Sequence, residues 1–181
     1  MKKTLKKIKA FQKATKFVQI KREVSKSIRL VNSGYILDHT KDFVVVQECE
    51  DFRLLGYLIL PTAQIKKVQH KKTDAYYDKI MEKEGMKDQV FLNTTLDLKN
   101  WKSIFKIFQN LKKPIIIECE GAAYNSFSIG PVTQVNANSV EILHFDAMGK
   151  VAKSSTQIAF EDITCVQFDD RYIDVFYKYA Q

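Results

Sequence analysis

Apolar positions along the chain follow two periodicities, and these alternate in the same order in both halves. Spacings of three and four residues predict amphipathic helices, and runs of Val, Ile, Phe and Tyr bounded by polar turn residues predict short strands. The predicted helices cover residues 3–14, 73–85, 98–112 and 169–179. The predicted strands cover residues 16–23, 33–40, 42–49, 54–61 and 64–69, and then 114–120, 128–135, 138–145, 155–160 and 162–168. The pattern therefore predicts an α+β fold that is mainly β.

Capping residues mark the ends of two of these helices. Thr73 is the predicted N-cap of the second helix, and Gly85 occupies its C′ position. Asp97 is the predicted N-cap of the third helix, which Pro114 ends. Each half therefore opens and closes with a helix.

The sequence Ile-x-x-Val-Gln occurs at residues 65–69 and again at 163–167. At an offset of 97 residues, "FQKATK" (11–16) lies over "FQNLKK" (108–113), and at an offset of 96, Gly34 lies over Gly130. Ordered matches of this kind over roughly sixty residues favour a tandem duplication. We expect the Ile and Val of each stretch to close a core, while the Gln begins the exit toward the closing helix.

The duplication divides the chain of 181 residues into two units. The first predicted unit covers residues 1–85 and the second covers residues 98–181, with a junction at 86–97. Units of about 80 residues are long enough to bury a core each. We expect each to be a small five-stranded barrel flanked by helices.

Two stretches resemble the first signature of Sm-like proteins. In "SGYILDHTKDFVVVQ" (33–47) a Gly is followed by an apolar residue two positions on, an Asp and an apolar strand, and "SIGPVTQVNANSVEIL" (128–143) is a looser version. The resemblance covers roughly residues 30–69 and 126–167 and implies tandem SH3-like or Sm-like barrels. Asp42 replaces the Asn of the family's RNA-binding loop, and neither unit has the family's basic-Gly pair, so the RNA site is not implied. The chain also has the general look of small bacterial proteins without an assigned function.

The positive charge is concentrated at the start of the chain. Residues 1–30 contain 11 Lys or Arg and one acidic residue, whereas residues 31–181 contain 18 basic and 20 acidic residues. Five lysines of the first helical segment fall within about 80° of arc, opposite its apolar stripe. The candidate residues for binding an anion or nucleic acid are Lys2, Lys6, Lys9, Lys13, Lys16, Lys21 and Arg22. Such a face suits a phosphate backbone, an acidic protein, an anionic membrane surface or simple solvation.

Motifs for catalysis or cofactor binding do not stand out. His39 and His144 lie near Asp38 and Asp146 and could form an acid–base pair, although a solvated loop histidine is the commoner reading. The two "ECE" stretches lack the spacing of a metal site, and no glycine-rich phosphate loop occurs. We therefore predict no catalytic residue, no bound metal and no cofactor.

Three cysteines, an odd number spaced far apart, favour reduced and buried thiols in a cytoplasmic protein. The basic N-terminus lacks the apolar segment of a secretory signal, and no apolar run is long enough for membrane insertion. The sequence thus predicts a non-enzymatic binding or adaptor protein that engages another protein, for example as an inhibitor or immunity-type protein. The alternative is RNA binding through the lysine-rich helix. The oligomeric state stays open.

Overall fold

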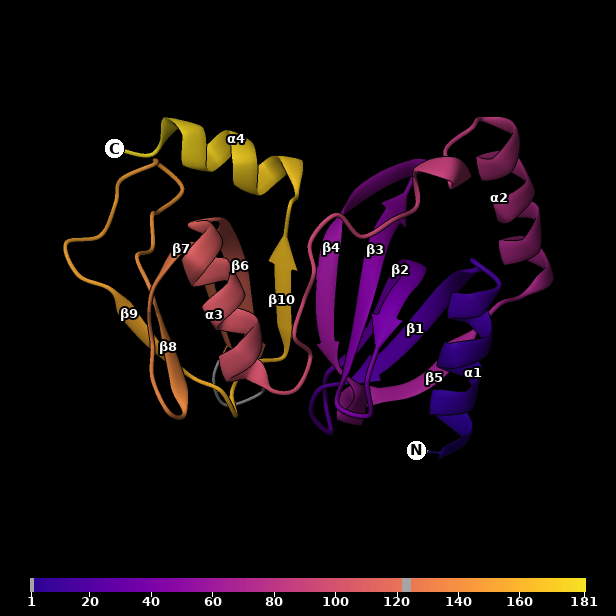
Figure 1. Cartoon of the computed structure of the whole chain (residues 1–181), viewed down its shortest axis with the longest axis horizontal. Coiled ribbons are helices and arrows are strands. Elements are labelled where there is room, and N and C mark those ends of the chain that lie inside the picture. Colours follow the sequence, from indigo (N-terminus) through magenta and orange to yellow (C-terminus); the bar gives the residue numbers. More distant parts are fainter. Residues whose placement is uncertain (1, 122–124) are drawn as a thin grey trace. The chain divides into compact units, whose positions relative to one another are not determined.

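The computed structural model describes residues 2–121 and 125–181, and its fold is α+β and mainly β, as the sequence predicts. The chain divides into two compact units, Met1–Thr95 and Leu96–Gln181 (Figure 1). Segment 86–95, predicted as part of a junction, belongs to the first unit, where Met86 and Val90 pack against its core.

The first unit runs from helix to sheet to helix. Its elements are α1 (Lys2–Lys13), β1 (Phe17–Glu23), β2 (Arg29–His39), β3 (Phe43–Glu50), β4 (Arg53–Pro61), β5 (Ile65–Gln69) and α2 (Lys72–Lys83). Short 3₁₀ turns, η1 (Thr62–Gln64) and η2 (Lys87–Gln89), precede β5 and follow α2. The antiparallel strands lie in the order β5-β1-β2-β3-β4.

The second unit repeats this sequence of elements. They are α3 (Trp101–Leu111), β6 (Pro114–Glu120), β7 (Asn125–Val135), β8 (Ser139–Ile142), β9 (Thr156–Ala159), β10 (Cys165–Phe168) and α4 (Arg171–Tyr179). The strand order is β10-β6-β7-β8-β9, so the fifth strand again lies beside the first.

The sheet of each unit is open. Among the described strands, the fourth and fifth of each unit lie at opposite edges and do not pair with each other. The strands nevertheless curve strongly, as Figure 1 shows for β1–β4. The structure therefore contains curved five-stranded sheets rather than the closed barrels expected from the sequence.

A glycine lies just before a bulge of the second strand in each unit, where the strand bends. A Cβ at Gly34 would lie 2.1 Å from the carbonyl oxygen of Gln47, and a Cβ at Gly130 would lie 2.1 Å from that of Leu143. The register of β2 on β3 shifts between Ile36 and Asp38, just beyond the glycine, and β7 on β8 shifts at the corresponding place. Bulges of this kind increase local twist and bend the strand.

The opening helix of each unit is fixed to this bend by one glutamine. Gln12 of α1 donates from Nε2 to the carbonyl oxygen of Leu37 at 2.7 Å, and Gln109 of α3 donates to that of Thr133 at 2.8 Å. Both helices then leave through a residue with positive φ, Thr15 at 43° and Lys112 at 53°. The helix contact and the helix exit are therefore the same in both units.

The repeated glutamines connect the fifth strand to the first. Nε2 of Gln69 donates to Oε1 of Gln19 at 2.9 Å, and Nε2 of Gln167 donates to Oε1 of Glu118. The Ile and Val of both stretches are buried, which confirms their predicted place in the core. These contacts give the Ile-x-x-Val-Gln repeat its physical meaning, since the stretch returns the chain to the first strand.

Two predicted helix caps are wrong. The N-cap of α3 is Asn100, whose Oδ1 accepts from the Ser103 N–H at 2.9 Å, because Leu98 and Lys99 form a turn before the helix and Leu98 is buried. Helix α2 begins one residue before Thr73, and the carboxylate of Asp74 accepts from the Lys71 N–H at 2.7 Å. Gly85 follows α2 with φ of 66°, as predicted for a C′ residue.

Across the described residues, every helix is too short or too polar to cross a membrane.

Candidate functional site: a basic groove on the first unit

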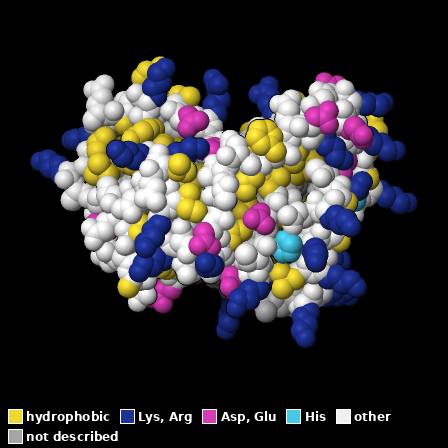
Figure 2. Space-filling model, viewed as in Figure 1, with side chains coloured by type: hydrophobic (Ala, Val, Ile, Leu, Met, Phe, Trp, Pro, Cys, Tyr) yellow, Lys and Arg dark blue, Asp and Glu magenta, His cyan; other side chains and the backbone are white. Residues whose placement is uncertain are grey.

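Most of the seven candidate cations lie on α1 and β1. Lys2, Lys6, Lys9 and Lys13 are exposed on α1, and Lys21 is exposed on β1. Lys16 follows the helix and is half-buried. Figure 2 shows dark blue side chains gathered over the region of α1. No ion pair is recorded for these lysines in the described part of the chain.

Arg22 differs from the other candidates because it is only 3% exposed. Its Nε donates to Oδ1 of Asn32 at 2.7 Å, and its Nη1 donates to Oε1 of Gln64 at 3.2 Å. Arg22 follows Val18 and Ile20 at alternate positions of β1, so its side chain lies on the buried face of the strand. Arg22 therefore ties β1, β2 and the turn before β5 together, away from the lysine face.

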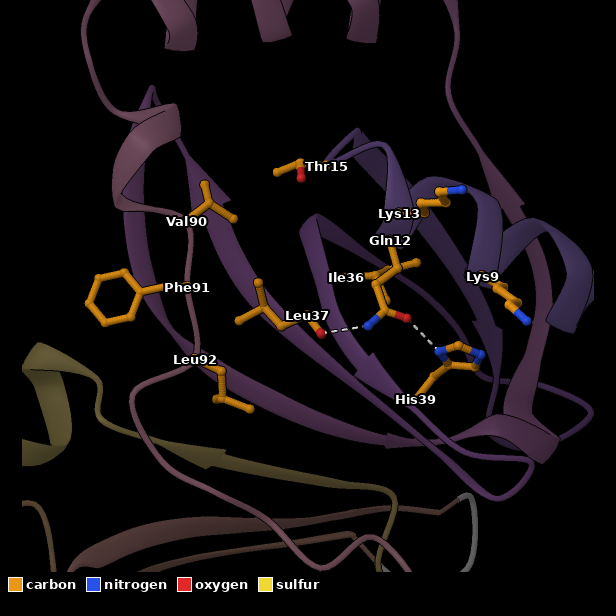
Figure 3. A pocket seen from close by; sticks show the side chains of 10 residues that line it. All are labelled: Lys9, Gln12, Lys13, Thr15, Ile36, Leu37, His39, Val90, Phe91 and Leu92. Atoms are coloured by element: carbon orange, nitrogen blue, oxygen red, sulfur yellow. Dashed lines mark hydrogen bonds between the residues drawn. The ribbon is translucent and has the colours of Figure 1, made fainter.

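A groove of about 500 Å³ runs along one flank of α1 (Figure 3). Lys9, Gln12 and Lys13 line it from the helix, and His39 lines it from the end of β2. The opposite wall is the segment Val90–Leu92, whose Phe91 is 57% exposed. The groove, which we call the α1 groove, thus combines cationic groups on one side with apolar groups on the other.

Gln12 organises the polar side of the α1 groove. Its Nε2 is used by the Leu37 carbonyl, so its Oε1 faces His39, whose Nδ1 lies 2.6 Å away. Since an amide oxygen only accepts, Nδ1 of His39 carries the hydrogen of this bond. The neutral ring then presents Nε2 as a hydrogen-bond acceptor, and the protonated ring presents it as a second donor.

The apolar wall is held in place by two contacts. The hydroxyl of Tyr57 donates to the carbonyl oxygen of Phe91 at 2.9 Å. Upstream, Nζ of Lys87 lies 3.6 Å from Oδ1 of the buried Asp78. Asp78 also accepts from the Phe17 N–H at 3.2 Å and from the Tyr35 hydroxyl at 3.0 Å. The groove is therefore built on the same polar contacts that attach α2 to the sheet.

The predicted histidine–aspartate pairs do not form between ring and carboxylate. Asp38 accepts from the backbone N–H of His39 at 2.7 Å, while the His39 ring bonds Gln12. His144 accepts at Nδ1 from the Ile129 N–H at 3.2 Å. Asp146 accepts from the Lys150 and Met148 N–H groups, which lower the pKa of its carboxyl. Each of these four side chains is thus engaged in local structure.

The cysteines are buried, as predicted. Cys49 lies 3.4 Å from the Tyr77 hydroxyl, and burial raises the pKa of the Cys49 and Cys119 thiols. The described residues hold no group of three or more His, Cys, Asp or Glu side chains placed to bind a metal ion. The thiols therefore act as core side chains.

The tyrosines of the closing helices differ in exposure. Tyr77 packs against the sheet of its own unit by stacking between Phe17 and Phe52. The others, Tyr76, Tyr172, Tyr177 and Tyr179, remain exposed. Helical spacing alone does not distinguish the packed ring of Tyr77 from the exposed tyrosine rings.

The second unit has a different surface at the corresponding place. At offsets of 97 and 96, Lys9 corresponds to Lys106, Lys13 to Asn110 and His39 to Val135. The Gln109 contact with the bulge is present there without a histidine partner. The second unit therefore keeps one of the two groove cations, and its fold requires neither the second cation nor the histidine.

Searches against protein-family models, curated proteins and solved structures return no match. The function must therefore be argued from the geometry of the site.

Proposed function

We propose that this chain is a non-enzymatic binding protein whose first unit engages an acidic protein partner through the α1 groove. The observation that carries the proposal is the arrangement of Lys9, Lys13 and His39 opposite the exposed Phe91. Protein interfaces commonly combine an apolar centre containing an aromatic anchor with a charged rim. An acidic segment with apolar side chains would satisfy both walls.

RNA binding is the second candidate. An exposed aromatic ring beside lysines can stack a base while the ammonium groups contact phosphates. Phe91 and the lysines of α1 supply both kinds of group. The acidic partner is favoured because Val90 and Leu92 extend the wall with aliphatic surface that stacking does not use.

We further propose that the two units are tandem SH3-like or Sm-like repeats that arose by internal duplication. The shared strand order, the glycines at the bends and the glutamine contacts of α1 and α3 support this. A cytoplasmic location is proposed as well, supported by the three buried thiols.

Fluorescence anisotropy on the purified full chain tests the proposal. One labelled probe is an acidic peptide of alternating Glu and Leu, and the other is a single-stranded RNA of equal charge. Both are titrated from about 50 to about 200 mM salt, where phosphate contacts should weaken RNA binding steeply. The variants are Lys9→Gln/Lys13→Gln and Phe91→Ala, with Lys102→Gln/Lys106→Gln on α3 as the control of equal charge.

An acidic partner predicts that the peptide binds and that both groove variants weaken it about tenfold, whereas the α3 control changes it little. Binding of RNA alone, with a steep salt slope, would replace the leading proposal with the second one. Failure of both probes to bind, or equal loss in the groove variants and the α3 control, contradicts a site in the α1 groove.

A further inference from the structure

The opposite flank of α1 carries a second basic hollow, between the helix and strand β5. It has a volume of about 190 Å³ and is lined by Lys3, Thr4 and Lys7 of α1 and by Lys66, Lys67 and Val68 of β5. We call it the α1–β5 hollow. It shares no lining residue with the α1 groove.

A bulge explains why two consecutive lysines of β5 face outward. Lys67 pairs with Lys21 of β1, but Arg22 then pairs with Ile65, so Lys66 is the extra residue. A bulge leaves its extra residue out of the regular alternation of the strand. Lys66 and Lys67 are accordingly both exposed, between buried Ile65 and Val68.

Like charges meet around this hollow in two places. Lys3 and Lys7 are neighbours at i and i+4 on α1, and Lys21 lies directly opposite Lys67 in the sheet. Both arrangements are unfavourable in the absence of an anion. The carboxylate recorded near these lysines belongs to Glu23, 3.6 Å from Nζ of Lys66, and it also lies 3.8 Å from Nε of Arg29.

The fold does not need this concentration of charge. At an offset of 97, Lys3, Lys7 and Lys21 correspond to Asn100, Ile104 and Glu118. At an offset of 98, Lys66 and Lys67 correspond to Thr164 and Cys165. The second unit therefore builds the same sheet and helix without a cation at any of these positions.

We propose that the α1–β5 hollow is a binding site for a small polyphosphate, either inorganic or the phosphate chain of a nucleotide. Lysine ammonium groups bind phosphates as point charges. The volume is below the roughly 300–1,000 Å³ of pockets for drug-sized ligands, so the ligand must carry several charges in little space. Linked phosphates meet this requirement, and the Thr4 hydroxyl adds a neutral donor.

The residues that line the hollow also predict whether it prefers inorganic polyphosphate or a nucleotide. It contains no aromatic ring on which a base could stack. A nucleoside attached to the phosphates should therefore add little affinity. The α1–β5 hollow and the α1 groove share no lining residue, so binding at one does not require binding at the other.

The test uses the full ¹⁵N-labelled chain titrated with inorganic tripolyphosphate and, separately, with ATP, both free of metal and at constant ionic strength. Binding is followed by amide chemical shifts and by calorimetry. The site variant is Lys7→Gln/Lys66→Gln/Lys67→Gln. The matched control is Lys6→Gln/Lys9→Gln/Lys13→Gln, which removes the same charge from the outer face of α1 and the α1 groove.

We expect saturable shifts at Thr4, Lys7, Lys66, Lys67 and Val68 in the wild type, with similar Kd values for tripolyphosphate and ATP. The site variant should raise Kd about tenfold or more, and the control about threefold or less. Equal loss in both variants, or wild-type shifts centred on other residues, would overturn the proposal. The wild-type shift map decides the matter even if the triple variant folds poorly. Loss of peptide binding to the α1 groove with polyphosphate binding intact would count only against the proposed function.

Discussion

The closing helices α2 and α4 attach to their sheets differently, since α2 adds polar contacts to the apolar contact of its buried Met81, whereas α4 relies on apolar residues. Helix α2 buries two carboxylates, Asp74 and Asp78, whereas the fully buried residue of α4 is Ile173, with Phe176 packed beside it. A buried carboxylate needs specific donors, and α2 finds them in the backbone of Phe17 and Lys71 and in the Tyr35 hydroxyl.

This difference matters for the site because polar contacts fix a position more narrowly than apolar ones. Asp78 holds Lys87, and the chain from Lys87 leads directly into the apolar wall of the α1 groove. In the second unit, the residues after α4 pair with a loop instead: the Gln181 N–H donates to the carbonyl oxygen of Gly149, and the Val151 N–H donates to that of Gln181. The unit that carries the groove is thus also the one with the directional attachment.

Removing the buried carboxylate should give the largest effect. Asp78→Ala leaves the Phe17 N–H, the Tyr35 hydroxyl and Lys87 without their acceptor, and we expect a loss of about 4 kcal/mol in the free energy of unfolding. Phe176→Ala on α4 should cost less, because that ring is only half-buried. Residue-resolved hydrogen exchange on the full chain measures each unit separately. An equal cost for both would remove the distinction between the helices.

Substitution of the glycines beside the bulges, Gly34 and Gly130, should give the next largest loss of stability, and the two losses should be similar. Gly34→Ala and Gly130→Ala each place a methyl group against a carbonyl oxygen, and we expect each to cost about 3 kcal/mol. Gly85→Ala is the control, because its Cβ meets nothing within 4 Å and only the positive φ opposes it. We expect about 1 kcal/mol there. Urea unfolding gives these values, and a tolerated Gly130→Ala would show that the second bend is less constrained.

Alkaline pH should lower the stability of the first unit through its buried tyrosines. Burial, and then Asp78, raises the pKa of Tyr35, while burial raises the pKa of Tyr77 to about 12. The folded first unit therefore favours the neutral phenols. The contribution of the two neutral phenols to the free energy of unfolding is complete below the unfolded-state pKa of about 10. It is lost as the pH rises from there through about 12.

Urea unfolding of wild type and Tyr77→Phe, compared at pH about 9 and about 11, checks this expectation. The wild type should lose more stability over this interval than the variant. The opposite order would show that the Tyr77 hydroxyl is not the group that titrates.

The smallest expected effects come from the helix glutamines. Gln12→Ala and Gln109→Ala each remove one hydrogen bond to a bulge carbonyl, worth about 1 kcal/mol. Gln12→Ala should cost slightly more than Gln109→Ala, because it also removes the hydrogen bond to His39, and it alone should weaken peptide binding. Unfolding and anisotropy on the same samples provide the check. If Gln12→Ala leaves peptide affinity unchanged, the orientation of His39 does not matter for binding.

The sequence predicted the strands well because apolar alternation follows from burial of one face of a strand and continuous β-branched runs follow from burial of both. It did not predict that Asp74 and Asp78 are buried. Helical periodicity treats acids as solvent-facing, and the partner of Asp78 in β1 lies 61 residues away in sequence. Arg22 was assigned to the lysine face because a charged residue suggests exposure, although it alternates with the buried Val18 and Ile20 and lies on the inner face of β1.

The sequence alone predicts the cationic side of the α1 groove but not its apolar wall. The lysines of α1 follow from a helical wheel, because a helix of one register places them regardless of the rest of the chain. The wall at Val90–Leu92 could not be predicted, because its residues show no periodicity and are fixed by Tyr57 and Lys87. Because residues 86–97 were predicted to be a junction between units, the apolar wall of the groove was not predicted.

The return of the fifth strand to the first has a kinetic consequence. Gln19 and Gln69 are 50 residues apart, and Glu118 and Gln167 are 49 apart, whereas the first four strands of each unit pair with their neighbours in sequence. Long loops close at a higher entropic cost, so the hairpins should form before this pairing. Each unit is therefore expected to complete its folding when its Ile-x-x-Val-Gln stretch docks.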